Sequence, residues 1–254
     1  MAKGIKKLLH AYIMAQSMFC AIPFPCVWDE EARSWMLPCL PAVGLVIGGL
    51  WYGLWRAMEA LRLPAPLGAA LLAVLPYLAT GFLHLDGFLD TSDALLSRRP
   101  LEEKLRILKD PHTGAFAIVS LGVLLLVCYG AALSILQAGG EAGPLLLVPV
   151  LSRSLSASFV LFAKPLETSQ YSGGFRDRRS AGQRAAVLTA CALAMGGLLA
   201  LWGLKGLWAM LFCAAGQTLS TSRAIRQLGG MSGDLSGYGL TIGEACALAA
   251  LAVF

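Results

Sequence analysis

Residues 113–140 read TGAFAIVSLGVLLLVCYGAALSILQAGG, a stretch without a single charged side chain. A membrane-spanning helix needs about 20 mainly apolar residues, so this stretch is long enough to cross a bilayer on its own. Further uncharged runs lie on both sides of it, over residues 11–28, 36–55, 63–83, 142–152, 154–163, 185–204 and 206–222. The pattern predicts a helical integral membrane protein.

The composition of the whole chain agrees with this prediction. Hydrophobic residues make up 57% of the chain and charged residues only 14%, and the mean hydropathy is +0.69, whereas about 25% of a soluble domain is charged. The net charge of +5 is spread over loops, which suits the positive-inside rule better than nucleic-acid binding. The seven cysteines include no Cys-x-x-Cys pair, and we interpret them as neither disulfides nor metal ligands.

No repeat or linker divides the chain, so residues 1–254 are expected to form a single membrane domain with an all-α, polytopic helix bundle. Two long polar islands rich in Arg and Lys, 84–112 and 164–184, are predicted to face the cytoplasm. The alternation of the later spans places residues 22–36 on the cytoplasmic side, and Lys3, Lys6 and Lys7 favour the same side. Both ends of the first helix can lie on that side only if this helix does not span the membrane. We therefore expect about seven spans plus an interfacial or re-entrant N-terminal helix. An N-terminus on the outside is the alternative.

Three aspartates follow the run 63–83, in the stretch HLDGFLDTSD at residues 84–93. On a helix, Asp90 and Asp93 fall about 40° and 20° either side of Asp86, so all three share one face. Like charges at this spacing repel each other, and no Lys or Arg lies within the stretch. Because oxygen ligands suit a hard divalent cation, the pattern predicts a metal site with these three ligands. The alternative is a solvated face with Asp86 as an N-cap.

Two further features lie close to this stripe in sequence. On a continuous helix His84 points about 160° away from Asp86, so it joins the site only if the helix starts or distorts around residues 81–85. The loop KDPHTG at residues 109–114 offers Lys109 and His112 to a phosphate and Asp110 as a ligand for a second metal. The alternative for this loop is a capped turn with a snorkelling lysine.

Other candidate residues lie far along the chain. Arg153 is isolated in apolar sequence, and we interpret it as a phosphate-binding residue; the alternative is pairing with Glu141 or an aspartate of the stripe. The segment SGGFRDRR at 172–179 suits an anionic ligand or lipid headgroups. In the Gly-rich loop 229–237 the backbone can approach a phosphate closely, and Asp234 can reach a metal.

The motifs within residues 81–114 strongly resemble those of the membrane-bound cobalamin-5'-phosphate synthases, also called adenosylcobinamide-GDP ribazoletransferases. The most specific part is the pattern H-L-D-G-x-x-D-T-x-D at 84–93 followed by K-D-P-H-T-G at 109–114. Residues 228–234 resemble the family's C-terminal Gly-Gly-x-[Ser/Thr]-Gly-Asp motif, with Glu244 downstream. The segment IPFP at 22–25 and the pair Ser152-Arg153 also match in kind and order. The later part of the loop departs from the family pattern at Ser236 and Tyr238.

The resemblance implies a late step of cobalamin biosynthesis. The phosphocorrinoid moiety of adenosylcobinamide-GDP would be transferred to the 3'-hydroxyl of α-ribazole, or of its 5'-phosphate, with release of GMP. The resemblance also implies a need for Mg²⁺ and a location in the cytoplasmic membrane of a prokaryote, with the active site facing the cytoplasm. The sequence leaves open whether the protein forms a homo-oligomer.

The resemblance also implies roles for individual residues. Asp86 and Asp90 would be metal ligands, and Asp93 would be a ligand or the general base, with His84 as the other candidate for the base. The residues predicted to bind substrate are Lys109, Asp110, His112, Arg153 and Asp234.

Two other classes of protein share some of these sequence features. A CDP-alcohol phosphotransferase requires Asp-Gly-x-x-Ala-Arg, but Asp90 and Thr91 stand where Ala-Arg should be. A cation-coupled transporter would also carry carboxylates and an arginine in its spans. However, the stripe lies beside a long polar island, and no inverted repeat is seen in the sequence.

Overall fold

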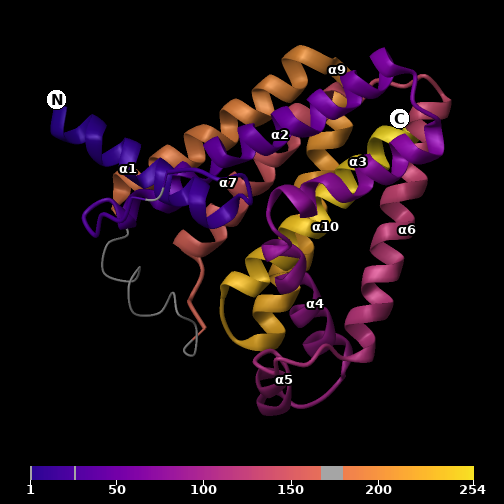
Figure 1. Ribbon diagram of the computed structural model, residues 1–254. Helices are drawn as coiled ribbons and strands as arrows, with labels where there is room; N and C mark the ends of the chain where they lie inside the picture. Colours follow the sequence, from indigo (N-terminus) through magenta and orange to yellow (C-terminus); the bar gives the residue numbers. More distant parts are fainter. Residues whose placement is uncertain (1, 26, 167–179) are drawn as a thin grey trace.

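The computed structural model describes residues 2–25, 27–166 and 180–254, and every regular element within them is helical (Figure 1). The elements are α1 (Ala2–Phe19), η1 (Arg33–Trp35), α2 (Met36–Leu61), α3 (Ala65–Ala79), α4 (Leu83–Leu96), α5 (Leu101–Ile107), α6 (Ala115–Gln137), η2 (Gly143–Leu146), α7 (Val148–Phe162), α9 (Ala181–Leu228) and α10 (Gly233–Val253). The all-α prediction is therefore confirmed for the described residues.

Four helices among the described residues are long and apolar enough to cross a membrane, and α3 with α4 gives a fifth if that bent pair is counted as one span. The predicted number of about seven is not confirmed. One reason is that α7 has only 15 residues. Another is that the uncharged runs 185–204 and 206–222, expected to give separate spans, lie in the single element α9, whose backbone breaks at Gly203 with φ 52° and ψ −125°.

The chain bends by 93° between α3 and α4, just before the acidic stripe. Two successive residues, Gly81 (φ 58°) and Phe82 (φ 64°), adopt the left-handed conformation, which ends the α-helical path. The backbone N–H of Ala21 donates a 2.8 Å hydrogen bond to the carbonyl of Ala79, and so fastens the segment after α1 to the end of α3. As a result, α4 carries the aspartates away from the axis of the apolar helix α3.

The helices α4 and α10 pack in close contact, because each presents a glycine to the other. A Cβ on Gly87 would lie 2.7 Å from the carbonyl oxygen of Asp234, and one on Gly237 would lie 2.8 Å from that of His84. The rings of Phe88 and Tyr238 stack beside this contact, with centroids 5.8 Å apart. The close packing brings the start of α10 against the acidic face of α4.

In the bundle α10 lies between α4, α6, α7 and α9, while α1 packs on α2 at the opposite side from α6 (Figure 1). The indole of Trp51, only 2% exposed, fixes α2 to α3 by donating a 2.9 Å hydrogen bond to the carbonyl of Leu72. The helix α9 begins with a capping box between Ser180 and Gln183. The six cysteines that the structure describes are free.

Candidate active site

The first turn of α4 places His84 and Asp86. The helix begins at Leu83, after the left-handed Phe82. This start lies within residues 81–85, where a helix start was the condition for His84 to join the site. Phe82 is the N-cap residue and no side chain caps the helix, so the alternative with Asp86 as N-cap is wrong. Asp86 lies instead in the first helical turn, where the helix dipole favours a carboxylate.

The carboxylates of the stripe are joined by one from α10. The partly buried Asp90 is in the electrostatic field of three other carboxylates, those of Asp86, Asp234 and Asp93. Asp234 comes from the first turn of α10 and is also partly buried. The structure thus assembles four negative side chains around the contact between α4 and α10, an arrangement that a cation would stabilise.

A cavity of about 490 Å³ adjoins these carboxylates. Its wall contains five of the predicted site residues, contributed by α4, the segment after α5, α7 and the start of α10: His84, Asp86, Lys109, Arg153 and Asp234. Residues from four segments of the chain, 23 to 150 positions apart, therefore meet at one cavity. The side chains of Asp90 and Asp93 are not part of its wall.

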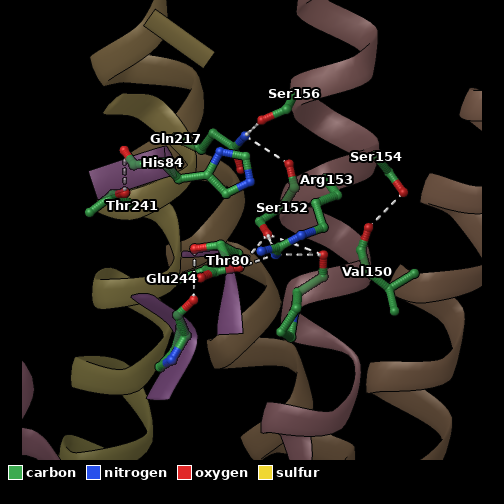
Figure 2. A network of polar contacts seen from close by, with 12 residues as sticks. Thr80, His84, Val150, Ser152, Arg153, Ser154, Ser156, Gln217, Thr241 and Glu244 are labelled. Carbon is green, nitrogen blue, oxygen red and sulfur yellow. Dashed lines mark hydrogen bonds and ion pairs between the residues drawn. The ribbon is translucent and has the colours of Figure 1, made fainter. Parts of the chain in front are cut away.

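A buried ion pair joins α7 to α10 beside the cavity (Figure 2). The Oε1 atom of Glu244 accepts hydrogen bonds from Nη1 of Arg153 at 2.5 Å and from Oγ of Ser152 at 2.7 Å. From α9, Nε2 of Gln217 donates to the carbonyl of Ser152 at 2.8 Å and to Oγ of Ser156 at 2.9 Å. Three helices are thus held together by polar contacts in an otherwise apolar interior.

Several polar atoms in this region have no hydrogen-bond partner among the described residues. Besides Oε1 of Gln217, they are Nε and Nη2 of Arg153 and Nε2 of His84. The side chains of Arg153 and His84 are only 1% and 8% exposed, and both residues form part of the cavity wall. Figure 2 shows the His84 ring facing α7, the helix that carries Arg153. Because a buried unsatisfied donor is costly, a ligand with acceptor oxygens is the natural partner for the two guanidinium nitrogens, whereas Nε2 of neutral His84 can donate or accept.

Comparison with protein families gives a match over nearly the whole chain. The cobalamin-5-phosphate synthase family model matches residues 11–252. The chain belongs to the cobalamin-5-phosphate synthase family. The matched range includes the stripe, the cavity and the buried ion pair.

Curated relatives support the membership in this family. The chain is 34% identical over 251 residues to an adenosylcobinamide-GDP ribazoletransferase of Clostridium botulinum (strain Alaska E43 / Type E3), covering 98% of this chain and 100% of the relative. It is 36% identical over 241 residues to the protein of the same name from Clostridium perfringens (strain 13 / Type A), covering 94% and 96%. No solved structure matches the chain.

Asp93 and the loop 109–114 contact each other. Both belong to the motif that resembles the cobalamin-5-phosphate synthase family. The Asp93 carboxylate packs against Gly114, the N-cap of α6, so closely that a Cβ at this position would collide with it. Asp110 and His112 pair with each other on the surface, with Oδ1 and Nδ1 2.7 Å apart, and neither lines the cavity. The backbone N–H and ring of His112 hold the pKa of Asp110 below its usual value. Of this loop's predicted substrate ligands, only Lys109 lies at the cavity.

The donor atoms near the stripe are compatible with Mg²⁺ in their chemistry. Within the part of the chain that the structure describes, no three His, Cys, Asp or Glu side chains converge closely enough to hold one metal ion. Magnesium is usually bound by only one or two carboxylates, together with water and substrate phosphates, rather than by an all-protein cage. The pair Asp86 and Asp234 at the cavity, with Asp90 behind them, therefore fits an ion that a phosphorylated substrate completes.

Sequence reasoning missed the partner of Arg153. The partner is neither Glu141 nor an aspartate of the stripe but Glu244, and Gln217 is not among the predicted site residues. A signal for the pair does exist in the sequence. Arg153 is the only charged residue between positions 142 and 163, and Glu244 is the only one between 238 and 254. Two lone opposite charges in apolar helices are expected to pair, because each is costly to bury alone.

The two glycine-containing loops have different outcomes. The loop 229–237 is described: Gly229 ends α9 with φ 86°, and Ser232 caps α10 by accepting from the backbone N–H of Leu235 at 3.3 Å. The hydroxyl of Ser232 also donates to the Asp234 carboxylate at 3.3 Å, which orients this side chain at the cavity. The segment 172–179 lies outside the described residues.

Proposed function

We propose that this protein transfers the phosphocorrinoid moiety of adenosylcobinamide-GDP to the 3'-hydroxyl of α-ribazole or its 5'-phosphate, with release of GMP. The observation that carries the proposal is the convergence of five motif residues on one cavity in a member of the cobalamin-5-phosphate synthase family. Membership in this family favours this reaction over lipid phosphotransfer and over cation-coupled transport.

The proposed reaction is a displacement at phosphorus. The 3'-oxygen of the acceptor forms a bond to the phosphorus that carries the corrinoid, and the bond from this phosphorus to the oxygen bridging to GMP breaks. The electron pair of the broken bond leaves with GMP, and the proton of the hydroxyl passes to a base. His84 is the base that the geometry favours, because it lies in the cavity wall and its Nε2 has no partner among the described residues. Asp93, the other candidate, packs against Gly114 outside the wall.

Charge on the phosphates must be balanced during this transfer. Arg153 and Lys109 reach the cavity from two sides and can bind phosphate oxygens, which stabilises charge on the transferred and leaving groups. For Mg²⁺ we propose Asp86, Asp90 and Asp93, helped by Asp234, with at most two of these carboxylates contacting any one ion and the substrate phosphates completing its ligands. When bound, Mg²⁺ supplies electrostatic stabilisation of the diphosphate. Glu244 and Ser152 fix the guanidinium of Arg153 before any substrate arrives.

We further propose that the protein is a multi-pass component of a prokaryotic cytoplasmic membrane, with its active site on the cytoplasmic side. Support comes from the apolar helices of membrane-spanning length and from the Lys- and Arg-rich polar island 84–112, which contains the stripe and Lys109. The count of about seven spans and the interfacial position of α1 belong to the same proposal.

The test is an assay with purified protein in lipid, supplied with adenosylcobinamide-GDP, α-ribazole and Mg²⁺. We expect equal amounts of GMP and of the corrinoid with its nucleotide loop closed. Well-folded protein that forms neither product would overturn the proposed function.

A further inference from the structure

The wall of the cavity changes in character from one side to the other. Its polar residues come from α4, the start of α10, Lys109, and Arg153 and Ser156 of α7, with Leu83, Leu108 and Leu240 among them. The part of the wall formed by α1, α2, the end of α7 and the segment after it is apolar: Met18, Phe19, Leu37, Leu40, Val160 and Leu166. These apolar residues take no part in the proposed phosphate chemistry.

The residues of α7 show how far this gradient extends. Arg153, Ser156 and Val160 all contribute to the wall, and at i, i+3 and i+7 they lie on one face of the helix. At 1.5 Å per residue, the distance from Arg153 to Val160 along the axis is about 10 Å. Along α7 the wall therefore changes, over about 10 Å, from the buried guanidinium of Arg153 to the apolar side chain of Val160.

An aromatic ring lies near the boundary between the two parts. Phe19, the last residue of α1, is 8% exposed and stacks on His84 with ring centroids 6.2 Å apart and planes at 14°. Phe19 thus joins the apolar wall to a residue of the polar wall. A flat aromatic group entering from the polar side would meet this ring, since aromatic pairs favour stacked or edge-to-face contact.

The size of the cavity distinguishes between the two substrates of the proposed function. A volume of about 490 Å³ lies in the range of sites that enclose one small molecule. The donor carries a corrin ring with its amide side chains as well as a nucleotide, which is too bulky to be enclosed there. The acceptor is a single nucleoside with an apolar aromatic base at one end and ribose hydroxyls at the other, so its polarity follows that of the wall.

We infer that this cavity is the binding site of the acceptor nucleoside, with its aromatic base in the apolar end between α1, α2 and α7 and its ribose toward His84 and Asp86. This inference rests on the proposed function and names the substrate that the cavity encloses. The donor then brings only its diphosphate to the polar side of the cavity, where Arg153 and Lys109 lie. The corrin ring stays outside.

The inference is tested by filling the apolar end. Val160→Phe places a ring in the space assigned to the base, while Val123→Phe adds the same ring on the exposed face of α6, where Val123 is 57% exposed. We expect Val160→Phe to raise the KM for α-ribazole about tenfold or more, with the KM for adenosylcobinamide-GDP unchanged. Val123→Phe should change neither constant.

A second acceptor separates a blocked base site from general damage to the fold. The riboside of unsubstituted benzimidazole lacks two methyl groups, so Val160→Phe should lose less affinity for it than for α-ribazole. Equilibrium binding of α-ribazole, measured without donor, should weaken in the same variant. If Val160→Phe does not fold, Val160→Ala is used, and it should increase the preference for acceptors with larger bases.

The inference is overturned if Val160→Phe binds α-ribazole as tightly as the wild type, or if only the KM for the donor rises. Both outcomes are measured by comparing the variant with a wild-type enzyme that is active. They are therefore distinct from failure of the proposed function, in which the wild type forms no GMP.

Discussion

Arg153 and Glu244 form an ion pair across the interface of α7 and α10, with Nη1 and Oε1 2.5 Å apart and both side chains almost completely buried. The pair uses only one terminal nitrogen of the guanidinium. Nε and Nη2 of Arg153 have no partner among the described residues, although the residue forms part of the cavity wall. A carboxylate that holds one edge of an arginine, while the other edge has no partner among the described residues, would position the guanidinium for the phosphate ligand that we propose.

Loss of the Glu244 charge tests the ion pair. Breaking a buried pair by removing one partner leaves an uncompensated charge and costs about 3–5 kcal/mol. We expect Glu244→Ala to lower the free energy of unfolding by about this amount, and Glu244→Gln to lose less, because it keeps hydrogen bonds to Arg153 and Ser152. Thermal unfolding in the same lipid or detergent measures both variants.

A double variant separates stability from function at this pair. Apolar residues of similar volume can replace a buried ion pair with little loss of stability, so Arg153→Met with Glu244→Leu should fold. We expect it to be inactive, because the group that binds phosphate is gone. Near wild-type turnover in this variant would show that the pair is only a structural link between the helices.

The contact between α4 and α10 gives a second prediction. Gly87→Ala and Gly237→Ala each place a methyl group under 3 Å from backbone of the facing helix. We expect a loss of about 1–3 kcal/mol in stability and reduced turnover, because the acidic face moves away from Asp234. Gly49→Ala and Gly130→Ala are matched controls, since no other group lies within 4 Å of the added methyl. Equal stability in all four variants would contradict the close packing.

Two basic residues of the loop 109–114 are expected to differ in importance. Lys109 lies at the cavity, whereas His112 is on the surface and bonded to Asp110. We expect Lys109→Gln to raise the KM for adenosylcobinamide-GDP about tenfold, in an effect that weakens at high salt. His112→Gln should keep a nearly unchanged KM. Steady-state kinetics at two salt concentrations distinguish the variants, and the reverse ranking would remove Lys109 from the site.

The position of α1 is tested by thiol labelling in a background without native cysteines. Gly4 has no other group within 4 Å of an added Cβ, so Gly4→Cys is free of steric conflict. With Lys6 and Lys7 on the cytoplasmic side, we expect a membrane-impermeant reagent to label this thiol in inverted vesicles but not in intact cells. Ala138→Cys, exposed after α6, should show the opposite pattern. Labelling of Gly4→Cys from outside alone would reverse the assigned orientation.

The sequence predicted much of the fold, because charge and hydrophobicity directly determine which helices a bilayer accommodates. The uncharged run 113–140 is indeed a long apolar helix, α6. The number of membrane spans is harder to predict from the sequence. Whether 185–222 forms one helix or two depends on the backbone at Gly203, and hydropathy does not report a single residue with positive φ. The length of α7 depends likewise on the 3₁₀ turn before it, η2.

For the site, the sequence predicted which residues carry charge but not how they meet. Helical spacing places Asp86, Asp90 and Asp93 on one face, and the glycine at 87 indicates that something approaches closely. That this neighbour is the backbone of Asp234 depends on tertiary packing. The left-handed Phe82 could not be foreseen, because non-glycine residues seldom adopt this conformation, yet it determines where the helix of His84 begins.

The most direct test of the central claim is the rate of GMP release from adenosylcobinamide-GDP and α-ribazole, with and without Mg²⁺, for the wild type and for Asp90→Asn. We predict release by the wild type that stops with EDTA and resumes with Mg²⁺, and none by folded Asp90→Asn. Undiminished release in EDTA, or near wild-type rates for Asp90→Asn, Asp86→Asn and Asp93→Asn alike, would contradict the assignment of these aspartates as the metal site.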